Sequence, residues 1–436
     1  MTRSTILALG LFLGLAVPVL PEQPADEAGA ARTIDDLIGA LSASKPEQRI
    51  EAIDALADRG KDATQAVSAL LQQLDADDPG VRASAAEAVG KIGAEADTVV
   101  RTLIAHFPDE GYVERFEPRY EAIPLFAVYA FAVAAFGEPA VAPLIDALKS
   151  DSQQVYLGAA IALEAMGQSA AKAMPQLITM LESGDGAKRR AAAGAIRGIG
   201  PAAADAVPLL VKLLHDEDFH SQYWACRALG AIGPASAVAS GDLLDRLSHG
   251  TVSVRRNAAA ALGNIGPDIG PEAAARLIRV VEEEFTAPVR EEAVIALGKL
   301  KPYAKESVPV LRKALADPGF HLPTHTARAL WLLTGDPGEA LPTLVRSLDD
   351  LTYFQHAAEV LAEMGPKASP AVERLIAALA ERDPDDRVAA ARALGHIGAP
   401  AAKAEVPLRR LLEDDELHVR EAAGAALKAI SEAQVK

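Results

Sequence analysis

Apolar residues recur at helical spacing in two consecutive segments of this chain, and the pair of segments repeats many times. In residues 234–266, a first apolar run is centred on Leu243, Leu244 and Leu247. A second run follows it and contains Val254, Ala258, Ala259, Leu262 and Ile265. Both runs repeat at intervals of three and four residues, which is the period of one face of an α-helix. The pattern predicts two helices in each unit, and no stretch alternates apolar and polar residues for long enough to predict a strand.

Short turn motifs mark where these helices begin and end. The second helix of a unit is expected to begin at an Asp-Pro pair, because aspartate caps a helix N-terminus and proline fits its first position. Such pairs are Asp78-Pro79, Asp317-Pro318 and Asp383-Pro384. The same helix is expected to end at a Gly-Pro pair, because glycine tolerates the left-handed C-cap and proline cannot continue a helix. Such pairs are Gly200-Pro201, Gly233-Pro234 and Gly266-Pro267.

The motif Gly-x-Ile-Gly closes several units and sets their register. It occupies residues 90–93, 230–233, 263–266 and 395–398. With weaker equivalents, the closing positions are Gly60, Gly93, Gly137, Gly167, Gly200, Gly233, Gly266, Lys301, Thr334, Gly365, Gly398 and Ser431. Seven of the eleven intervals are 33 residues long, a period typical of solenoids whose units bury their apolar faces against their neighbours. The predicted fold is therefore all-α: an α-solenoid superhelix of about twelve helical hairpins over residues 33–436.

Composition agrees with many shallow layers rather than one globular core. Half of the residues are hydrophobic but only 4% are aromatic. Alanine pairs such as Ala85-Ala86 and Ala258-Ala259 place small side chains on the second helix, which lets neighbouring backbones approach closely. Leu, Ile and Val of the first helix are expected to supply the bulk of the core.

Arginine stands eleven residues before the closing position in seven units. These residues are Arg49, Arg82, Arg189, Arg255, Arg290, Arg387 and Arg420. They could form a basic binding stripe or a structural ladder. We favour the ladder, because each arginine lies in the first turn of the second helix near acids such as Asp78, Asp385 and Asp415. Stacked copies would then make charge-assisted hydrogen bonds between units.

The repeated pattern Asp-x-x-Val-Arg-x-x-Ala-Ala-x-Ala-Leu-Gly-x-Ile-Gly-Pro resembles HEAT repeats of the phycobilisome-lyase subtype. It is seen around Val81-Arg82, Val254-Arg255 and Val419-Arg420. The resemblance covers nearly all of the chain after its N-terminal segment and implies the helical-repeat fold. The family includes chromophore lyases and adaptors. In a lyase-like role, His220, Tyr223, Trp224 and Cys226 would form the natural pocket.

The first 21 residues do not fit the repeat and resemble a secretory signal peptide. Arg3 precedes an apolar run from Ile6 to Val17, which ends at a proline. The run is shorter than the roughly 20 apolar residues of a membrane span. We expect residues 1–21 to be a signal peptide, residues 22–32 to be a linker, and the protein to be exported to the periplasm or the extracellular space. An uncleaved segment anchored to the inner membrane is the alternative.

Charge narrows the kind of partner. The formal net charge is -17, from 60 acidic and 43 basic residues. Nucleic acid is not expected as a partner, because its binding depends on lysine and arginine neutralising phosphates. An acidic surface instead favours solubility or a basic partner. The single cysteine, Cys226, excludes an intrachain disulfide and is expected to be a small buried hydrophobe.

The longest interval, between Gly93 and Gly137, carries about eleven extra residues and eight of the chain's nineteen aromatic side chains. Proline, glycine and interleaved charges predict a protruding loop between the two helices, near residues 107–121. Its tip is either a contact site or a local plug, and tyrosine and arginine are enriched at interface hot spots. The candidate contact residues are Tyr112, Phe116, Arg119 and Tyr120.

Three other units have aromatic residues and histidines where the ladder arginine would stand. They are His215 to Trp224, Phe320 to Trp331 and Tyr353 to His356. Equivalent positions share one edge of a solenoid, and units stack at about 10 Å, so these groups are expected along one elongated groove rather than in one pocket. The candidate contact residues are His220, Tyr223, Trp224, Phe320, His321, Tyr353 and Phe354.

No catalytic set, cofactor site or metal site is predicted. The run from His215 to His220 is rich in metal-ligand types, but acids at a helix start already have a capping role. His321 and His325 are four residues apart, but Pro323 between them argues against a helical pair. No P-loop or dinucleotide fingerprint occurs.

The sequence therefore predicts a non-catalytic scaffold or adaptor of the cell envelope. It would bind a protein or peptide on the concave face of the solenoid and on the insertion loop. A HEAT-like lyase or metal-dependent enzyme is the alternative. A membrane is expected to be involved only through an uncleaved N-terminal segment, and the identity of the partner and the oligomeric state are left open.

Overall fold

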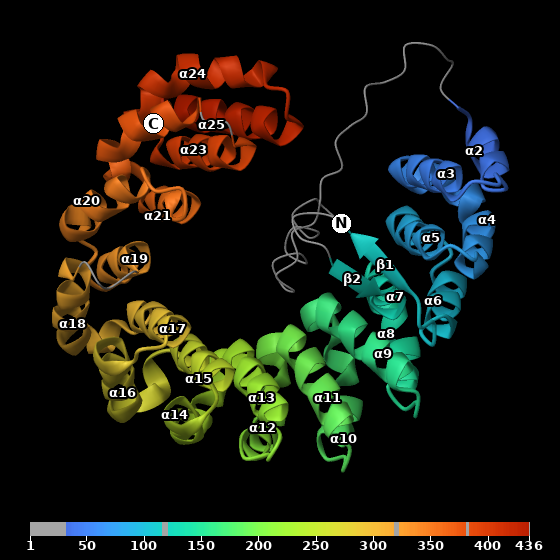
Figure 1. Ribbon diagram of the computed structural model, residues 1–436, viewed down its shortest axis with the longest axis horizontal. Helices are drawn as coiled ribbons and strands as arrows, with labels where there is room; N and C mark the ends of the chain where they lie inside the picture. The colour runs from blue at the N-terminus through green and yellow to red at the C-terminus, as the bar shows by residue number, and fades with distance from the viewer. Residues whose placement is uncertain (1–31, 116–120, 318–321, 381–382, 436) are drawn as a thin grey trace. The chain divides into compact units, whose positions relative to one another are not determined.

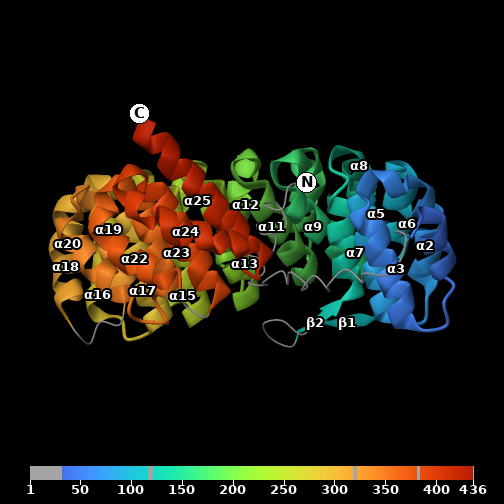
Figure 2. The same cartoon turned by 90° about the horizontal axis from the view of Figure 1, so that it is seen from above.

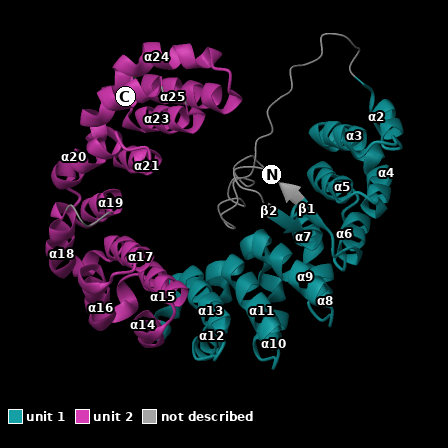
Figure 3. Cartoon of the chain, in the orientation of Figure 1, with its two compact units in different colours: residues 1–239 teal, residues 240–436 magenta. Residues whose placement is uncertain are grey.

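The protein is an array of helical hairpins (Figure 1), which confirms the predicted all-α solenoid. The computed structural model describes residues 32–115, 121–317, 322–380 and 383–435. The predicted signal peptide and nearly all of the predicted linker lie outside these residues. The chain divides into two compact units, unit 1 at residues 1–239 and unit 2 at residues 240–436 (Figure 3).

Unit 1 contains six hairpins, each with a first helix, A, and a second helix, B. The A helices are α2 (Ile34–Ala40), α4 (Val67–Gln72), α6 (Ala96–Ala105), α8 (Glu138–Ala147), α10 (Met174–Leu181) and α12 (Val207–Leu214). The B helices are α3 (Pro46–Asp58), α5 (Pro79–Ile92), α7 (Leu125–Ala134), α9 (Gln153–Met166), α11 (Gly186–Ile199) and α13 (Phe219–Ile232). Successive B helices pack against one another and form one layer, while the A helices form the other (Figure 3).

Unit 2 repeats this arrangement with six more hairpins. Its A helices are α14 (Ser240–His249), α16 (Gly270–Glu283), α18 (Ala304–Ala316), α20 (Pro337–Ser347), α22 (Val372–Ala378) and α24 (Glu405–Arg410). Its B helices are α15 (Val252–Ile265), α17 (Ala287–Gly298), α19 (Pro323–Thr334), α21 (Phe354–Met364), α23 (Pro384–Ile397) and α25 (Leu417–Val435). Its core is a continuous run of Leu, Ile, Val and Ala.

Short 3-10 helices precede many of the A helices or follow the last residues of them. They are η1 (Gly60–Ala66), η2 (Gln73–Asp75), η3 (Gly167–Ala173), η4 (Gly200–Ala206), η5 (Gly233–Ala239), η6 (Pro267–Ile269), η7 (Lys301–Tyr303), η8 (Gly365–Ala371), η9 (Ala399–Ala404) and η10 (Leu411–Glu413). One continuous stretch, Gly186–Leu214, is long and apolar enough to cross a membrane by length and composition. Half of it is buried within the protein, and it comprises α11, η4 and α12, as expected of core helices.

The predicted helix caps are present at most of the expected positions. The Asp78 side chain accepts a hydrogen bond from the backbone N–H of Val81, and Asp383 caps α23 in the same way through Asp385. The closing glycines have positive φ, for example 68° at Gly200 and 84° at Gly266. In this region a side chain would be strained, and the residue ends the helix.

Three sequence predictions about boundaries are wrong. The Asp317-Pro318 pair does not start a helix, because α18 ends at Ala316 and the next B helix starts at Pro323. At Thr334 the register is one residue off, because Gly335 has the positive φ of 68° and caps α19. The prediction of no strand also fails at the insertion, where two strands of four residues each form.

The insertion is a β-hairpin between α6 and α7, which confirms its predicted place between the two helices. Strands β1 (Tyr112–Arg115) and β2 (Glu121–Pro124) are antiparallel, with Tyr112 paired to Pro124. Figure 2 shows the hairpin projecting beyond α7 at one edge of unit 1. At its base, Phe107 is fully buried against Gly158 of α9, where a Cβ atom would come within 2.7 Å of the ring. The first aromatic residue of the insertion is therefore a core residue.

The arginine ladder is confirmed as a set of ion pairs between neighbouring units. Arg82 Nε lies 2.9 Å from Asp109 Oδ2, and Arg387 Nη2 donates to Asp414 Oδ1 at 2.8 Å. Arg189 and Asp216 are 2.5 Å apart, and Arg255 lies 3.3 Å from Glu284. The acids follow the arginines by 27 or 29 residues and belong to the next unit. The sequence-based assignment of Asp78, Asp385 and Asp415 as the partners is therefore wrong.

Each ladder acid also closes the turn on which it lies. Asp216 Oδ1 accepts a hydrogen bond from the backbone N–H of Asp218, and Asp414 Oδ1 accepts one from Glu416. Burial acts to raise the pKa of Asp414, but the hydrogen bonds from Arg387 and the Glu416 backbone outweigh it and lower that pKa. The ladder therefore ties the A-to-B turn of one unit to the turn of the next.

Glycine on the B helices allows very close packing. A Cβ atom at Gly263 would lie 2.7 Å from the Cα and Cβ atoms of Ala296 on the next B helix. At Gly395 the corresponding distance to the Cα atom of Ala426 is 3.0 Å. Both are first glycines of the Gly-x-Ile-Gly motif. The first glycine thus serves helix contact, while the second ends the helix.

We predict opposite effects for two glycine-to-alanine changes in unit 2. Gly263→Ala should destabilise the fold by about 1–3 kcal/mol, because the new methyl group must displace the backbone of α17. Gly241→Ala on α14 meets nothing within 4 Å, so its higher helix propensity should stabilise the fold by up to about 1 kcal/mol. Urea unfolding followed by circular dichroism measures both. Equal stability of the two variants would contradict the close packing of α15 on α17.

Candidate functional site

The B helices of each unit present a surface that we call the B face. It consists of the half-buried and exposed side chains of successive B helices. On α13 these include His220, Tyr223, Trp224 and Arg227, whose spacing of three, one and three residues places them in one stripe along the helix. Three of the four were predicted as contact residues, and Arg227 was not. The signal that could have identified Arg227 is its position one helical turn after Tyr223.

The most elaborate part of the B face of unit 1 is the Trp224 cluster, formed by Glu164, Arg197, Tyr223, Trp224 and Arg227. The rings of Tyr223 and Trp224 meet edge to face, with centroids 5.4 Å apart. The Arg227 guanidinium lies 5.4 Å from the Tyr223 ring and 5.1 Å from the Trp224 ring. Its Nη1 atom donates a hydrogen bond of 2.9 Å to the Tyr223 hydroxyl oxygen. Two aromatic faces thus hold one cation in a fixed orientation.

A second guanidinium approaches Trp224 from the neighbouring B helix. Arg197 on α11 lies 5.8 Å from the Trp224 ring and forms an ion pair with Glu164 of α9. Both side chains of this pair are largely buried, with exposed fractions of 10% and 13%. Burial, and then the nearby charge of Arg227, lower the pKa of Arg197 to about 10. The cluster is therefore electropositive, although the chain as a whole is acidic.

Two residues named with this cluster in the sequence analysis lie elsewhere. Cys226 is fully buried, which confirms its prediction as a core hydrophobe. It therefore does not share a surface pocket with Trp224. His220 is exposed at the start of α13, and its ring lies 4.0 Å from that of Phe219, which is 47% exposed.

The acids of the His215 to His220 run have structural partners. Asp216 is a ladder acid, as described above. Asp218 caps α13 by accepting hydrogen bonds from the backbone N–H groups of His220 and Ser221, and it pairs with Arg190 at 2.6 Å. Among the described residues, no three or more His, Cys, Asp or Glu side chains are arranged to hold a metal ion. The ligand-like composition of this run reflects capping and ion pairing.

The other predicted contact residues do not form one group. Tyr112 on the hairpin is 58% exposed, and Tyr353 is half-buried. Phe354 is only 3% exposed and packs in the core of unit 2, so its prediction as a surface contact is wrong. Its ring faces inward because it occupies a core position at the start of α21. The remaining candidates, Phe116, Arg119, Tyr120, Phe320 and His321, lie outside the described residues.

On the B face of unit 2, sequence-distant histidines form a stacked pair. The rings of His325 on α19 and His356 on α21 are 4.3 Å apart and nearly parallel. His325 Nε2 lies 3.3 Å from a carboxylate oxygen of Glu291, and His356 Nδ1 lies 3.7 Å from one of Glu359. The other nitrogen of each ring is buried and has no hydrogen-bond partner among the described residues. The stack joins two of the aromatic and histidine groups identified in the sequence.

The histidine pair is neutral at neutral pH. Burial, followed by the charges of His356 and Arg328, lowers the pKa of His325 to about 4. Burial also lowers the pKa of His356 and outweighs the opposing effect of Glu359. Arg328 is itself held by two hydrogen bonds to Glu363. Two stacked imidazoles beside a guanidinium are thus kept uncharged by their surroundings.

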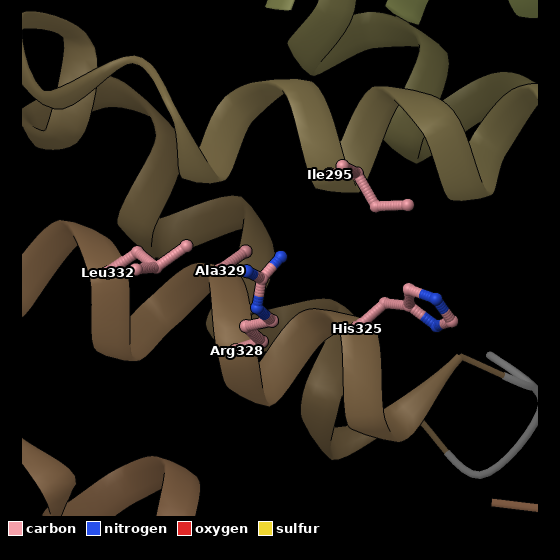
Figure 4. A pocket seen from close by; sticks show the side chains of 5 residues that line it. All are labelled: Ile295, His325, Arg328, Ala329 and Leu332. Atoms are coloured by element: carbon pink, nitrogen blue, oxygen red, sulfur yellow. The ribbon is translucent and has the colours of Figure 1, made fainter. Parts of the chain in front are cut away.

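The hollow beside this pair is too small for a substrate. Figure 4 shows Ile295 of α17 facing His325 and Arg328 of α19 across it, with Ala329 and Leu332 completing the lining. Its volume is about 10 Å³, which is about the space of one water molecule. A larger, open hollow lies at the ladder step beside the hairpin. Its charged side chains are engaged in pairs, Arg82 with Asp109 and His106 with Asp75.

Comparison with known proteins agrees with this architecture. A sequence family described as HEAT repeats matches residues 34–115, 174–240, 241–330 and 372–436, which is more than two thirds of the chain. None of the curated proteins compared matches the chain in sequence. Many solved structures are similar.

Two karyopherin-type structures cover most of the chain. One, from a study of Kap95p binding to RanGDP, is 13% identical with a TM-score of 0.53, and the match covers 92% of this chain and 63% of that one. The other, Kap121p bound to Ste12p, is 16% identical with a TM-score of 0.50, and the match covers 92% and 57%. This chain therefore spans less than two thirds of their length, and identities this low show a shared fold alone.

We predict that His325 makes stability depend on pH. Its pKa of about 4 in the folded protein is below the ordinary value of 6.5. The unfolded chain therefore binds more protons between these two values, and the folded state loses stability as the pH falls from about 6.5 towards 4. His325→Gln should reduce this loss by about 1–3 kcal/mol, since one pKa unit corresponds to about 1.4 kcal/mol. Chemical unfolding at pH 7 and pH 4.5 measures it.

His249→Gln provides the control for this measurement. His249 is 72% exposed and pairs with Asp245 on its own helix, so its replacement should leave most of the pH dependence unchanged. If the His325 and His249 variants lose as much stability as the wild type on acidification, burial of His325 is not the cause.

Proposed function

The chain belongs to the HEAT-repeat family, and we propose that it is a non-catalytic scaffold or adaptor that binds a protein or peptide on the B face. The observation that carries this proposal is the Trp224 cluster. Tyr223, Trp224 and Arg227 form one stripe on α13, and all three side chains are partly exposed. Tryptophan, tyrosine and arginine are the residue types that contribute most to binding at protein interfaces.

The architecture supports an extended contact rather than a catalytic pocket. The conserved spacing of the B helices repeats equivalent positions from unit to unit, so a partner can contact several helices in turn. In contrast, the polar groups with shifted pKa values are distributed over different helices, and the hollow beside His325 holds only about 10 Å³. The alternative of a HEAT-like lyase or metal-dependent enzyme has no comparable site to support it. The phycobilisome-lyase subtype stays a prediction.

The same fold supports protein binding in other proteins. Kap121p, for example, was crystallised bound to Ste12p and, separately, to the extreme C-terminus of the protein phosphatase Cdc14p. These partners belong to Kap121p and identify none for this chain. They support the proposal only in that a helical-repeat surface of this kind can hold another chain.

The hairpin is proposed as a second contact region. Tyr112 is 58% exposed on β1, although the strand is tied to β2 by backbone hydrogen bonds. An exposed aromatic residue on an ordered strand loses little conformational freedom when it binds. We further propose that the protein acts in the cell envelope, since residues 1–21 have the composition of a secretory signal peptide.

We predict that Trp224→Ala weakens binding of the native partner. Truncation of a hot-spot aromatic residue costs about 2 kcal/mol, or roughly thirtyfold in affinity. The immobilised protein is exposed to the envelope fraction of its native host, and proteins retained by wild type and variant are compared by quantitative mass spectrometry. The retained partner is then purified, and its dissociation constant for both proteins is measured. Tyr112→Ala tests the hairpin in the same way.

Phe285→Ala is the matched control for the capture experiment. Phe285 is an aromatic residue that is 97% exposed, but it lies on the turn between α16 and α17, outside the B face. Its replacement should leave retention unchanged. If Trp224→Ala and Phe285→Ala retain every partner equally, the Trp224 cluster is not the contact site.

We predict that the mature protein lacks the N-terminal segment. Export with cleavage would remove at least residues 1–21, since the apolar run ends before residue 21. Sequencing the N-terminus of protein isolated from its native host measures this directly. Recovery of an intact Met1 would show that the segment is retained, as in an uncleaved membrane anchor.

A further inference from the structure

We propose that the Trp224 cluster binds acidic peptides, with Arg227 pairing to a carboxylate and the Trp224 ring contacting the neighbouring apolar side chain. This inference rests on the proposed function and specifies the chemistry of the partner. It concerns a local site that differs in sign from the chain as a whole, whose net charge is -17.

The central observation is that Arg227 has no acidic partner. Its contacts are the Tyr223 hydroxyl and the faces of the Tyr223 and Trp224 rings. Among the described residues, no carboxylate forms an ion pair with it. Arginines on neighbouring B helices differ in this respect, since Arg190 pairs with Asp218 and Arg197 with Glu164.

Composition does not explain this missing partner. The chain has 60 acidic residues for 43 basic ones, so acids are in excess. A half-buried guanidinium loses hydration, and a carboxylate is the partner that best restores its interactions. Its absence beside Arg227 therefore leaves a position that an acid from another chain can fill.

The aromatic residues prepare Arg227 for such a partner. Contact with two rings holds the guanidinium plane, and one of its five N–H groups is used by Tyr223. The Tyr223 oxygen accepts that hydrogen bond, so its own O–H remains a donor. A carboxylate can thus receive hydrogen bonds from the guanidinium and from the phenol. This arrangement is fixed before binding, which reduces the entropy lost on association.

The charge of Arg227 is also felt within the protein. After burial, it is the largest cause that lowers the pKa of Arg197. Two guanidinium groups therefore share the Trp224 ring, while only Glu164 balances them. A bound carboxylate would reduce this repulsion, which adds to its attraction for Arg227.

The surface next to the cluster favours a peptide that is apolar as well as acidic. Phe219, which is 47% exposed, and His220 lie at the start of the same helix, with their rings 4.0 Å apart. They continue the stripe one turn before Tyr223. A polyanion such as nucleic acid is less suitable, because a single unpaired arginine neutralises a single phosphate.

The test selects peptides directly on the full-length protein. A phage library of random heptapeptides is selected on the wild type and on Arg227→Glu. One enriched heptapeptide is then synthesised with a fluorescein label, and its binding is measured by fluorescence anisotropy. The variants are Arg227→Glu, Arg227→Lys, Trp224→Ala and Arg392→Glu, and circular dichroism confirms that each is folded.

Arg392→Glu is a matched control. Arg392 on α23 stands six residues before its closing glycine, Gly398, as Arg227 stands six before Gly233. It is exposed and makes the same charge change possible without an aromatic cluster. We expect it to change the affinity less than twofold.

The expected result is enrichment of peptides with Asp or Glu next to an apolar residue. Arg227→Glu should weaken binding of the chosen peptide at least tenfold and should itself select peptides with Lys or Arg. Trp224→Ala should weaken binding by a similar factor, and Arg227→Lys by less than Arg227→Glu.

Three results would overturn the inference. If selected peptides depend on Trp224 but have no excess of acids, the cluster binds peptides of another chemistry. If Arg392→Glu weakens binding as much as Arg227→Glu, the effect is one of overall charge. If no heptapeptide is enriched, acidic peptides are not ligands, and the capture experiment with Trp224→Ala decides separately whether the scaffold function stands.

Discussion

The close approach of successive B helices is the constraint on which the rest of the structure depends. Where Gly263 faces Ala296, an additional carbon atom would be 2.7 Å from the next backbone. This spacing requires glycine and alanine along the contact, so the B helices can contribute little bulk to the core. Leu, Ile and Val must then come largely from the A helices, and polar or aromatic residues are restricted to the B face. The division of labour between the two layers follows from one short distance.

The ladder solves a different problem, the position of each unit relative to the next. Contacts between smooth alanine surfaces are not directional, whereas the pair of Arg189 and Asp216 joins defined points on consecutive turns. One unit departs from this rule in an informative way. Gln222 replaces the arginine and still donates to the carbonyl oxygen of Asp216, at 2.7 Å, but an amide carries no charge for a pair with the following turn. That unit also carries the Trp224 cluster, so the ladder is reduced where the surface is specialised.

The sequence was sufficient for features that repeat within one unit and insufficient for those that join units. Helix ends, closing glycines and the arginine positions depend on residues a few places apart, and they were predicted correctly in most units. The acid that pairs with Arg82 is 27 residues away, and the nearer Asp78 was a better guess from spacing alone. The His325–His356 stack has the same origin, because 31 residues separate its members. The hairpin was missed because strands of four residues leave too short an alternation.

The site of the hairpin shows where such an array can acquire new parts. It interrupts the chain between α6 and α7, at a turn, and the ladder pair of Arg82 and Asp109 remains intact beside it. A segment added inside a helix would shift the register of every later contact in that unit. A segment added at the A-to-B turn leaves the helices and their glycine contacts unchanged. The fold therefore separates growth from stability, and lineages of this protein can gain or exchange surface loops at one end of the helices without redesigning the stack that carries them.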